Sequence, residues 1–328
     1  MSVSTPLAAL GAAIAAAAVA AGYLAPASLL RGAERPFAGY GSLDVRIEAP
    51  SYPRHATGAD DVRTEIAAPP RRLVSQAWSS DEYLYAIVPP ERVVGVSETA
   101  YQERVSNVHA LAKRFQPAIA IDPEQVIRTA PDLVLTPADT RSDVPGLLRA
   151  AGVPVYRIPT MFPTLASLEE HILLIGYLTG EDARAEEELT RFRGVVTRAA
   201  ARRPPGAPAP RVMGFGGVYS YGSDTLFHDI LRVLGAENVA ATHGFAGYDR
   251  VTDEHIVRWD PEWIVAGADR GQADAVRARL LSNPAIAATT AAARGHVVVL
   301  EHHVFLPLSP YTSQLVDALS SALYGGTS

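Results

Sequence analysis

Three consecutive polar residues interrupt an apolar run near the end of the chain, in the stretch HVVVLEHHVFLPLSP. Glu301, His302 and His303 follow strand-forming residues, and an imidazole nitrogen can ligate a metal or hydrogen-bond a bound molecule. Neighbouring side chains of an extended chain point to opposite faces, so both histidines are not expected to chelate one ion. Three roles stay open here: a ligand to a metal or haem iron, a hydrogen-bonding or stacking residue of a cleft, and plain surface.

The rest of the sequence does not predict a zinc site, which would need three or four ligands. The chain has no cysteine and no H-x-x-x-H or H-E-x-x-H pattern. The other candidate ligands come from separate segments without ligand spacing: His109, His228, His243, Asp269 and Glu301. We therefore predict no metal site built by the protein alone, with His302 or His303 as the candidate iron ligand.

Aromatic and arginine side chains follow the predicted strands. In open parallel sheets a ligand binds beyond the carboxyl ends of the strands, so these residues are the candidate binding residues. They are Trp78, Ser79, Tyr101, Arg141, Phe162, Phe215, Tyr219, Tyr221, Tyr248, Arg250, Arg270, His302, His303 and Phe305, with Asp139, Met161 and Asp269 beside them. Aromatic faces suit a bulky ring-bearing ligand, and arginines suit carboxylate, phosphate or catecholate oxygens. The alternative for each is ordinary packing at a strand end, which is our expectation for Trp259 and Trp263.

Two function classes are disfavoured by the sequence. The net charge of -6 and the pI near 5.9 do not favour binding to nucleic acid. Ser220 in GVYSYG lacks the glycine two residues earlier that a nucleophile elbow requires, and we do not expect an enzyme.

The elements that position these residues alternate between strand and helix. The predicted order in residues 71–163 is strand 72–77, helix 80–87 with a serine N-cap, strand 92–97, helix 123–129 with Asp122 as N-cap, strand DLVLT, helix 144–151 and strand VPVYRI. A strand, a helix and a strand in so short a span indicate a parallel unit. The first lobe is therefore predicted as α/β with a parallel sheet.

Two helices separate this lobe from a second one with the same alternation. TLASLEEHILLIGYLTG and EDARAEEELTRFRGVVTRAAARR are predicted helices in a bridging region at 164–203, and the second lobe follows at 204–328. Residues 33–70 are expected to form a polar hairpin and linker. A length of 328 residues with 48% hydrophobic and 20% charged side chains fits a folded chain of two lobes.

An apolar stretch without charge opens the chain before the first arginine, Arg31. Residues 1–32 are expected to be an export signal, with an A-x-A pattern at 25–27, or an uncleaved N-terminal anchor. Both alternatives place the folded part in the periplasm, either free or tethered to the inner membrane.

Successive blocks of the chain resemble the class III periplasmic substrate-binding proteins of ABC importers, which deliver vitamin B12, ferric siderophores or haem. The blocks are RRLVSQAWSSDEYLYAIVPPERVVGVS, DPEQVIRTAPDLVLT, LLRAAGVPVYRIP, ILRVLGAENVA, DEHIVRWDPEWIVAG and GHVVVLEHHVFLPLSP, from about residue 54 to 325. The resemblance implies two Rossmann-like lobes joined by a single long rigid helix, with the ligand captured in the cleft between them. It implies no catalysis and no resident cofactor, because the metal chelate is cargo.

The resemblance also implies an ABC permease and its ATPase as partners of a monomer. Acids on the outer surface of each lobe meet the permease in this family, and the matching positions are Asp143 and Glu254. Ferric siderophores and cobalamin fit the residues equally well. Haem is less favoured, since the tyrosine that haem-binding members present before the PEQVI helix is missing from KRFQPAIAIDPEQVI. The alternative function is a membrane-anchored sensor or scaffold that kept the fold without transport.

Overall fold

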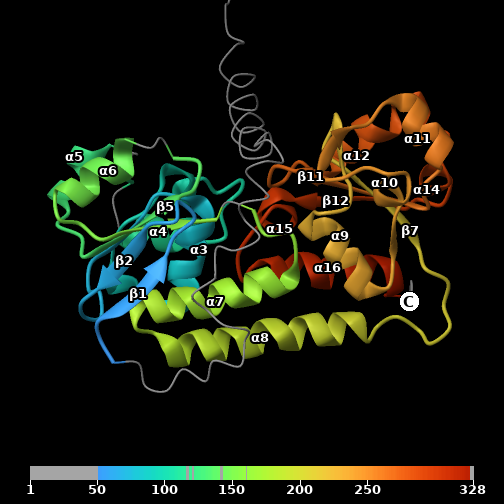
Figure 1. Cartoon of the computed structure of the whole chain (residues 1–328). Helices are drawn as coiled ribbons and strands as arrows, with labels where there is room; N and C mark the ends of the chain where they lie inside the picture. The colour runs from blue at the N-terminus through green and yellow to red at the C-terminus, as the bar shows by residue number, and fades with distance from the viewer. Residues whose placement is uncertain (1–50, 116–117, 120–121, 141–142, 160, 326–328) are drawn as a thin grey trace, which may run out of the picture.

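The computed structural model describes residues 51–115, 118–119, 122–140, 143–159 and 161–325 (Figure 1). The expected export segment at 1–32 and the candidate residue Arg141 lie outside these ranges. Within them, no helix combines the length and the apolar character needed to cross a membrane.

The first lobe contains a four-stranded parallel sheet in the order β4-β3-β5-β6. Helix α3 covers one face, and α5 and α6 cover the other (Figure 1). Strands buried on both faces need apolar runs, which explains a segment such as LVLTP in β5. The elements are β3 Leu73–Ser75, α3 Trp78–Ile87, η1 Pro90–Arg92, β4 Val93–Gly95, η2 Glu98–Tyr101, α4 His109–Phe115, α5 Pro123–Arg128, β5 Leu133–Pro137, α6 Asp143–Ala150 and β6 Val155–Ile158.

Helix α3 begins two residues earlier than the sequence predicts. Its N-cap is Ala77, without a side-chain hydrogen bond, and the serine N-cap expected at residue 79 is wrong. Ser80 is instead buried inside the helix, where its hydroxyl lies 2.6 Å from Ser75 Oγ. The shift places Trp78 in the first turn of the helix.

The second lobe has a mixed sheet in the order β10-β8-β7-β11-β12, with β9 also paired to β7. Strands β7, β9, β11 and β12 are parallel, but β8 runs antiparallel to β7 and to β10. The predicted parallel sheet is present in these four strands, and the antiparallel β8 and β10 at its edge were not predicted. The short connection after β7 contains Gly217 at φ 87°, and so tight a turn can only join antiparallel strands.

The elements of the second lobe are β7 Arg211–Phe215, β8 Tyr219–Tyr221, α9 Leu226–Leu234, β9 Glu237–Asn238, α10 Val239–Thr242, β10 Tyr248–Arg250, α11 Asp253–Trp259, β11 Trp263–Ala268, α12 Ala273–Leu281, α13 Pro284–Ala287, α14 Thr290–Ala293, β12 Val297–Glu301, α15 His302–Phe305 and α16 Thr312–Tyr324.

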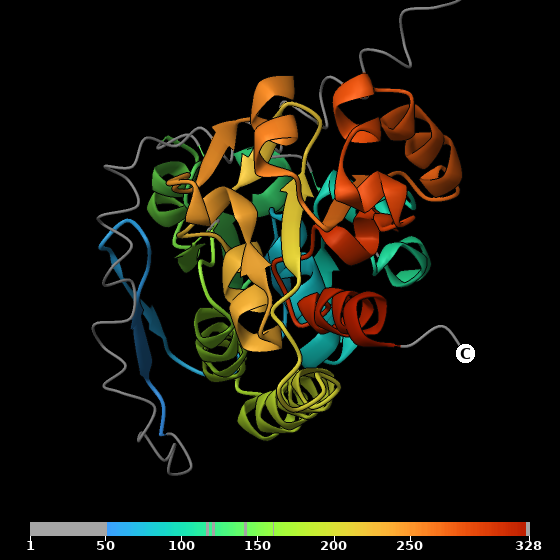
Figure 2. The same cartoon turned by 90° about the vertical axis from the view of Figure 1, so that its right-hand side faces the viewer.

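Helices α7 (Leu165–Thr179) and α8 (Asp182–Ala200) form the base beneath both lobes (Figures 1 and 2). Gly180 ends α7 at φ 76°, as the sequence predicts. Thr164 caps the other end of α7 reciprocally with Ser167. The 19 residues of α8 span about 28 Å. Both helices pack against α3 of lobe one and α9 of lobe two, so the long helix is paired along its length.

A hairpin of β1 (Arg54–Thr57) and β2 (Arg63–Ile66) precedes lobe one, as predicted, and lies to one side of it (Figure 2). Arg54 is 3% exposed and makes two hydrogen bonds to Asp182, at 3.2 and 2.7 Å, at the start of α8. The rings of Tyr52 and Tyr177 lie 4.6 and 4.9 Å from its guanidinium carbon. This buried, charge-assisted contact fixes the hairpin to the base.

One apolar cluster runs through both lobes and the helices between them. It includes Leu84 of α3, Leu168 of α7, Leu231 of α9 and Val316 of α16, all fully buried. The two lobes therefore share a core, and a change in their relative orientation must disturb its packing.

Candidate functional site

His302 and His303 lie in the first turn of α15, directly after β12. The expectation of an extended segment at this position is wrong, because the backbone turns into a helix at His302. The two side chains are 29% and 18% exposed. Neither is plain surface, and neither is sealed in the core.

The ring of His302 is oriented by Asp269. His302 Nδ1 lies 3.1 Å from Asp269 Oδ1, and Arg104 Nη1 of lobe one lies 3.5 Å from the same oxygen. A carboxylate only accepts hydrogen bonds, so Nδ1 donates, and in the neutral ring Nε2 keeps its lone pair. Burial lowers the pKa of His302, against the opposing effect of Asp269. Burial thus favours the neutral ring, and a carboxylate orients it, an arrangement shared by many metal-ligating histidines.

His303 is held from the opposite lobe through its backbone. Its carbonyl oxygen accepts a hydrogen bond of 2.7 Å from Asn107 Nδ2, and its Nδ1 lies 3.3 Å from Glu301 Oε2. Burial lowers the pKa of His303, and the charges of Arg270 and His109 act in the same direction. Burial therefore favours the neutral form of both adjacent histidines.

Four aromatic rings of lobe two pack next to these histidines. The ring of Tyr221 lies 5.5 Å from Tyr248, 5.7 Å from Phe305 and 5.3 Å from Phe227, measured between centroids. Phe227 and Phe305 are 6.2 Å apart. Most of these pairs meet edge to face, the geometry that ring quadrupoles favour. The cluster presents a rigid apolar surface in which Tyr221 and Tyr248 remain half-buried.

Two strand glycines make room for this arrangement. A Cβ at Gly267 would lie 2.6 Å from His302 Cδ2 and 2.9 Å from Phe305 Cδ1. A Cβ at Gly214 would lie 2.4 Å from the ring of Tyr221. Glycine is therefore required at both strand positions so that the rings can lie against the sheet.

Lobe one contributes Trp78 and, beneath it, Glu82. Trp78 is half-buried, and its Nε1 donates a hydrogen bond of 3.1 Å to Glu82 Oε1. Asn107 also donates to Glu82 Oε1, and the same amide group reaches His303. We name the connected set of Trp78, Tyr221, Tyr248, His302, His303 and Phe305 the boundary site.

Two of the predicted binding residues belong to the core instead. Phe162 is 2% exposed and packs with Tyr83 and His171 at ring distances of 6.3 and 5.0 Å. Phe215 is buried in the core of lobe two. Both predictions are wrong for this structure, since the strand and loop ends turn these rings inward. Trp259 is buried among His243, His255 and Phe245, as expected of a core residue.

The structure gives the remaining predicted residues other surroundings or contacts. Ser79 and Tyr101 are half-buried in lobe one, and burial raises the pKa of Tyr101. Tyr219 pairs in register with the exposed Arg250 across β8 and β10. Arg270 Nε lies 4.0 Å from Glu301 Oε2.

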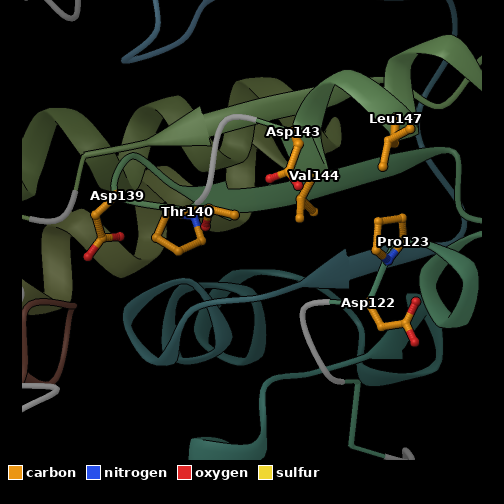
Figure 3. Close-up of a pocket in the computed structure, with 8 residues that line it drawn as sticks. Asp122, Pro123, Asp139, Thr140, Asp143, Val144 and Leu147 are labelled. Carbon is orange, nitrogen blue, oxygen red and sulfur yellow. The ribbon is translucent and has the colours of Figure 1, made fainter.

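A pocket of about 650 Å³ opens on lobe one at the ends of α5 and α6. Figure 3 shows Val144 and Leu147 of α6 facing Pro123 of α5 across it. Asp122, Asp139 and Asp143 also line it, so the charged side chains among its described lining residues are all acids. Of the sequence-predicted residues it gathers Asp139 and Asp143, and its charge suits a basic group.

Among the residues that the structure describes, no three His, Asp or Glu side chains gather as a metal-binding group. A histidine of the boundary site could therefore contribute one ligand to a metal that arrives with its own chelator, but the described residues do not form a cage.

The model of the periplasmic binding protein family matches residues 73–303. The chain belongs to the periplasmic binding protein family. This assignment confirms the resemblance, the two-lobed α/β fold and the expectation of a substrate-binding protein that is not an enzyme. The matched range covers both sheets and ends within the boundary site.

Three relatives show how far the similarity extends. A cobalamin-binding protein of Halobacterium salinarum is 27% identical over 92% of this chain and 81% of its own length. An uncharacterised ABC transporter substrate-binding lipoprotein of Bacillus subtilis is 26% identical over 70% of this chain and 73% of its own. The crystal structure of a periplasmic heme binding protein from Pseudomonas aeruginosa has a TM-score of 0.65 and 28% identity, over 79% of this chain and 94% of that one.

Sequence reasoning missed the polar residues that connect the lobes of this binding protein. Glu82, Asn107 and Ser309 have no motif, and a glutamate in a helix pattern is ordinarily read as exposed. The sequence did contain one signal that Glu82 is buried. It lies on a short helix beside the apolar residues Tyr83, Leu84 and Ile87.

Proposed function

We propose that this chain is the extracytoplasmic binding component of an ABC importer, and that it captures a metal chelate at the boundary site and delivers it to a permease. The observation that carries the proposal is the joining of four aromatic rings and two neutral histidines at the meeting point of the lobes. Such a surface offers apolar contact and uncharged nitrogen donors to a large ring-bearing ligand.

A corrinoid is the ligand we favour among the metal chelates. The cobalamin-binding relative aligns over nearly the whole chain, which supports this choice. The neutral rings suit a bulky macrocycle with apolar edges, whereas a catecholate or carboxylate siderophore would need cations. Near the boundary site, the described guanidiniums of Arg104 and Arg270 lie close to Asp269 and Glu301. Ferric siderophores are the second choice and haem the third.

Titration of the full-length chain with cyanocobalamin, haemin and a panel of ferric siderophores tests the proposal. Cyanocobalamin is expected to quench tryptophan fluorescence saturably, at one ligand per chain. If only a ferric siderophore binds, the proposed ligand changes from a corrinoid to a siderophore, and the proposed carrier function stands. Binding of none of them would overturn the carrier function in favour of a sensor or scaffold.

We further propose that Asp143 and Glu254 meet the permease. Both side chains are exposed, at the starts of α6 and α11. These two helices lie on the side of the molecule opposite α8 (Figure 1). The acidic pocket beside Asp143 fits an arginine or lysine of a partner. Rim charges of this kind mainly accelerate encounter and fix orientation.

The docking proposal is tested by uptake of the bound ligand in cells that carry the matching permease. The double variant Asp143→Ala with Glu254→Ala is expected to reduce uptake without changing ligand affinity. Glu124→Ala, at an exposed acid of α5, is the matched control. Uptake at the parent rate in the double variant would show that Asp143 and Glu254 are not needed for docking to the permease.

A further inference from the structure

Glu82 is a fully buried carboxylate that receives hydrogen bonds from both lobes. Its Oε1 accepts from Trp78 Nε1 at 3.1 Å, Asn107 N at 3.2 Å and Asn107 Nδ2 at 2.9 Å. Its Oε2 accepts from Ser309 Oγ at 2.5 Å. Trp78 and Asn107 belong to lobe one, and Ser309 belongs to lobe two. The side chain is 0% exposed.

A buried carboxyl is retained at such a position only if its hydrogen-bonding capacity is satisfied. Three donors satisfy Oε1, whereas Oε2 has Ser309 Oγ as its described donor, so removing the Ser309 hydroxyl would leave Oε2 unpaired where water does not reach. Such a loss costs more than the loss of a hydrogen bond at the surface, which water replaces. The hydrogen bond between Glu82 and Ser309 should therefore stabilise the contact of the two lobes more than a hydrogen bond at the surface would.

Asn107 provides a second connection between the lobes. Its Nδ2 donates both to Glu82 Oε1 and, at 2.7 Å, to the carbonyl oxygen of His303. Residues 302–309 are thus held by lobe one near both ends, through His303 and through Ser309. His302, His303 and Phe305 of the boundary site lie in this segment.

We propose that Glu82, Asn107 and Ser309 form an interlobe tie that positions residues 302–309 and sets the opening of the ligand site. The part that concerns the ligand rests on the proposed function, and the part that concerns the lobes does not. Glu82 is a positioning residue, since it acts on the site through Asn107 and Ser309.

Other described polar contacts between the lobes at this site are weaker. Arg104 and Asp269 are separated by 3.5 Å, and their side chains are 35% and 39% exposed. Exposed pairs of this kind contribute little to stability, because water and salt screen them. The interlobe tie is the polar contact whose loss should change the lobe orientation.

The tie is tested without ligand by measuring the distance between spin labels on the two lobes. The chain has no cysteine, so Glu124→Cys on α5 and Asp274→Cys on α12 give unique labelling sites, at side chains 86% and 99% exposed. Pulsed electron resonance of the full chain should give one narrow distance distribution. Ser309→Ala is expected to widen it and move it to longer distance.

Matched variants separate the tie from general loosening. Ser313→Ala removes a nearby hydroxyl that bonds only within its own segment, to the Pro310 carbonyl, and should leave the distribution unchanged. Asn107→Ala is a second test if Ser309→Ala does not fold. Glu82→Gln keeps the size and two polar atoms of the side chain, and should widen the distribution less than Glu82→Ala. A parent-like distribution in both Ser309→Ala and Asn107→Ala would overturn the tie.

The ligand part is tested by the dissociation rate of cyanocobalamin. Ser309→Ala should release this probe at least about tenfold faster than the parent, as expected when a buried oxygen loses its hydrogen-bond donor, with a smaller change in association rate. If Ser309→Ala widens the distance distribution but releases cyanocobalamin at the parent rate, the tie orients the lobes without affecting the ligand site. Failure of the parent to bind cyanocobalamin would overturn the proposal of a corrinoid ligand. The spin-label distances would still test the interlobe tie, because they are measured without ligand.

Discussion

Lobe two brings the aromatic rings of Tyr221, Tyr248 and Phe305 to the boundary site, whereas lobe one places two adjacent buried carboxyls near it, at the start of α3. Asp81 accepts hydrogen bonds from the backbone and hydroxyl of Ser97, and Glu82 accepts from four donors. The carboxyls of lobe one are committed to contacts within the protein. The half-buried rings of Tyr221 and Tyr248 still have surface to offer a ligand. We infer that lobe one supplies the frame and lobe two the larger share of the ligand contact.

The largest effect should come from a ring that lobe one uses only for packing. Phe162→Ala is expected to lower the free energy of unfolding by about 3–5 kcal/mol, because it opens a cavity beside Tyr83 and His171. Affinity for cyanocobalamin should stay at the parent value. Urea unfolding and fluorescence titration measure the two quantities. If Phe162→Ala weakened the affinity for cyanocobalamin without changing the free energy of unfolding, Phe162 would be a binding residue after all.

The buried carboxyl of Asp81 should make stability depend on pH. Burial raises its pKa from 3.8 to about 7. Between these values the folded protein keeps a proton on Asp81 that the unfolded chain has released, so the contribution of Asp81 to the unfolding free energy falls as the pH rises. The fall is on the order of 4 kcal/mol from about pH 4 to pH 7. Burial lowers the pKa of His171 to about 3, which gives stability the opposite pH dependence in every variant, so the test is a difference between two variants. As the pH rises from about 4 to 7, urea unfolding should show Asp81→Asn gaining stability relative to Asp274→Asn, an exposed control. A constant difference between the two would contradict the assignment.

Overpacking beneath the rings of lobe two should affect both folding and binding. Gly267→Ala places a methyl group against His302 and Phe305, which is expected to cost about 1–3 kcal/mol of stability and to weaken cyanocobalamin binding. Gly146→Ala is the control in lobe one. Nothing lies within 4 Å of its added Cβ, and a helix favours alanine over glycine by roughly 0.5–1 kcal/mol. Parent-like binding in Gly267→Ala would show that the position of His302 is unimportant.

The smallest effect on folding should come from the rim of lobe two. Tyr219→Ala is expected to change the unfolding free energy by less than about 0.5 kcal/mol, since the residue is half-buried on a short strand near the sheet edge. If its ring touches the ligand, affinity should fall roughly tenfold. Val218→Ala, at a neighbouring side chain that is 52% exposed, serves as the control. Equal affinities in both variants would remove Tyr219 from the binding residues.

The contrast between the lobes also explains what the sequence could predict. Periodicity and capping residues located Gly180 at the end of α7 and Asp122 at the start of α5, because these are local effects of backbone geometry. The antiparallel β8 was missed, because a strand of three residues has no sequence pattern that distinguishes parallel from antiparallel pairing. Phe162 and Phe215 were misassigned because the facing of a ring at a strand end depends on what packs above it. The tie of Glu82 with Ser309 joins residues 227 positions apart and leaves no local pattern.

The core shared by the two lobes makes them a single cooperative unit. The exposed segment at 204–210 is the covalent link between α8 and lobe two. A protease cut there would leave Leu231 and Val316 packed against the bridging helices in the same apolar cluster as before. The two fragments should therefore copurify and melt in one heat-absorption peak, which makes this binding protein suited to fragment complementation.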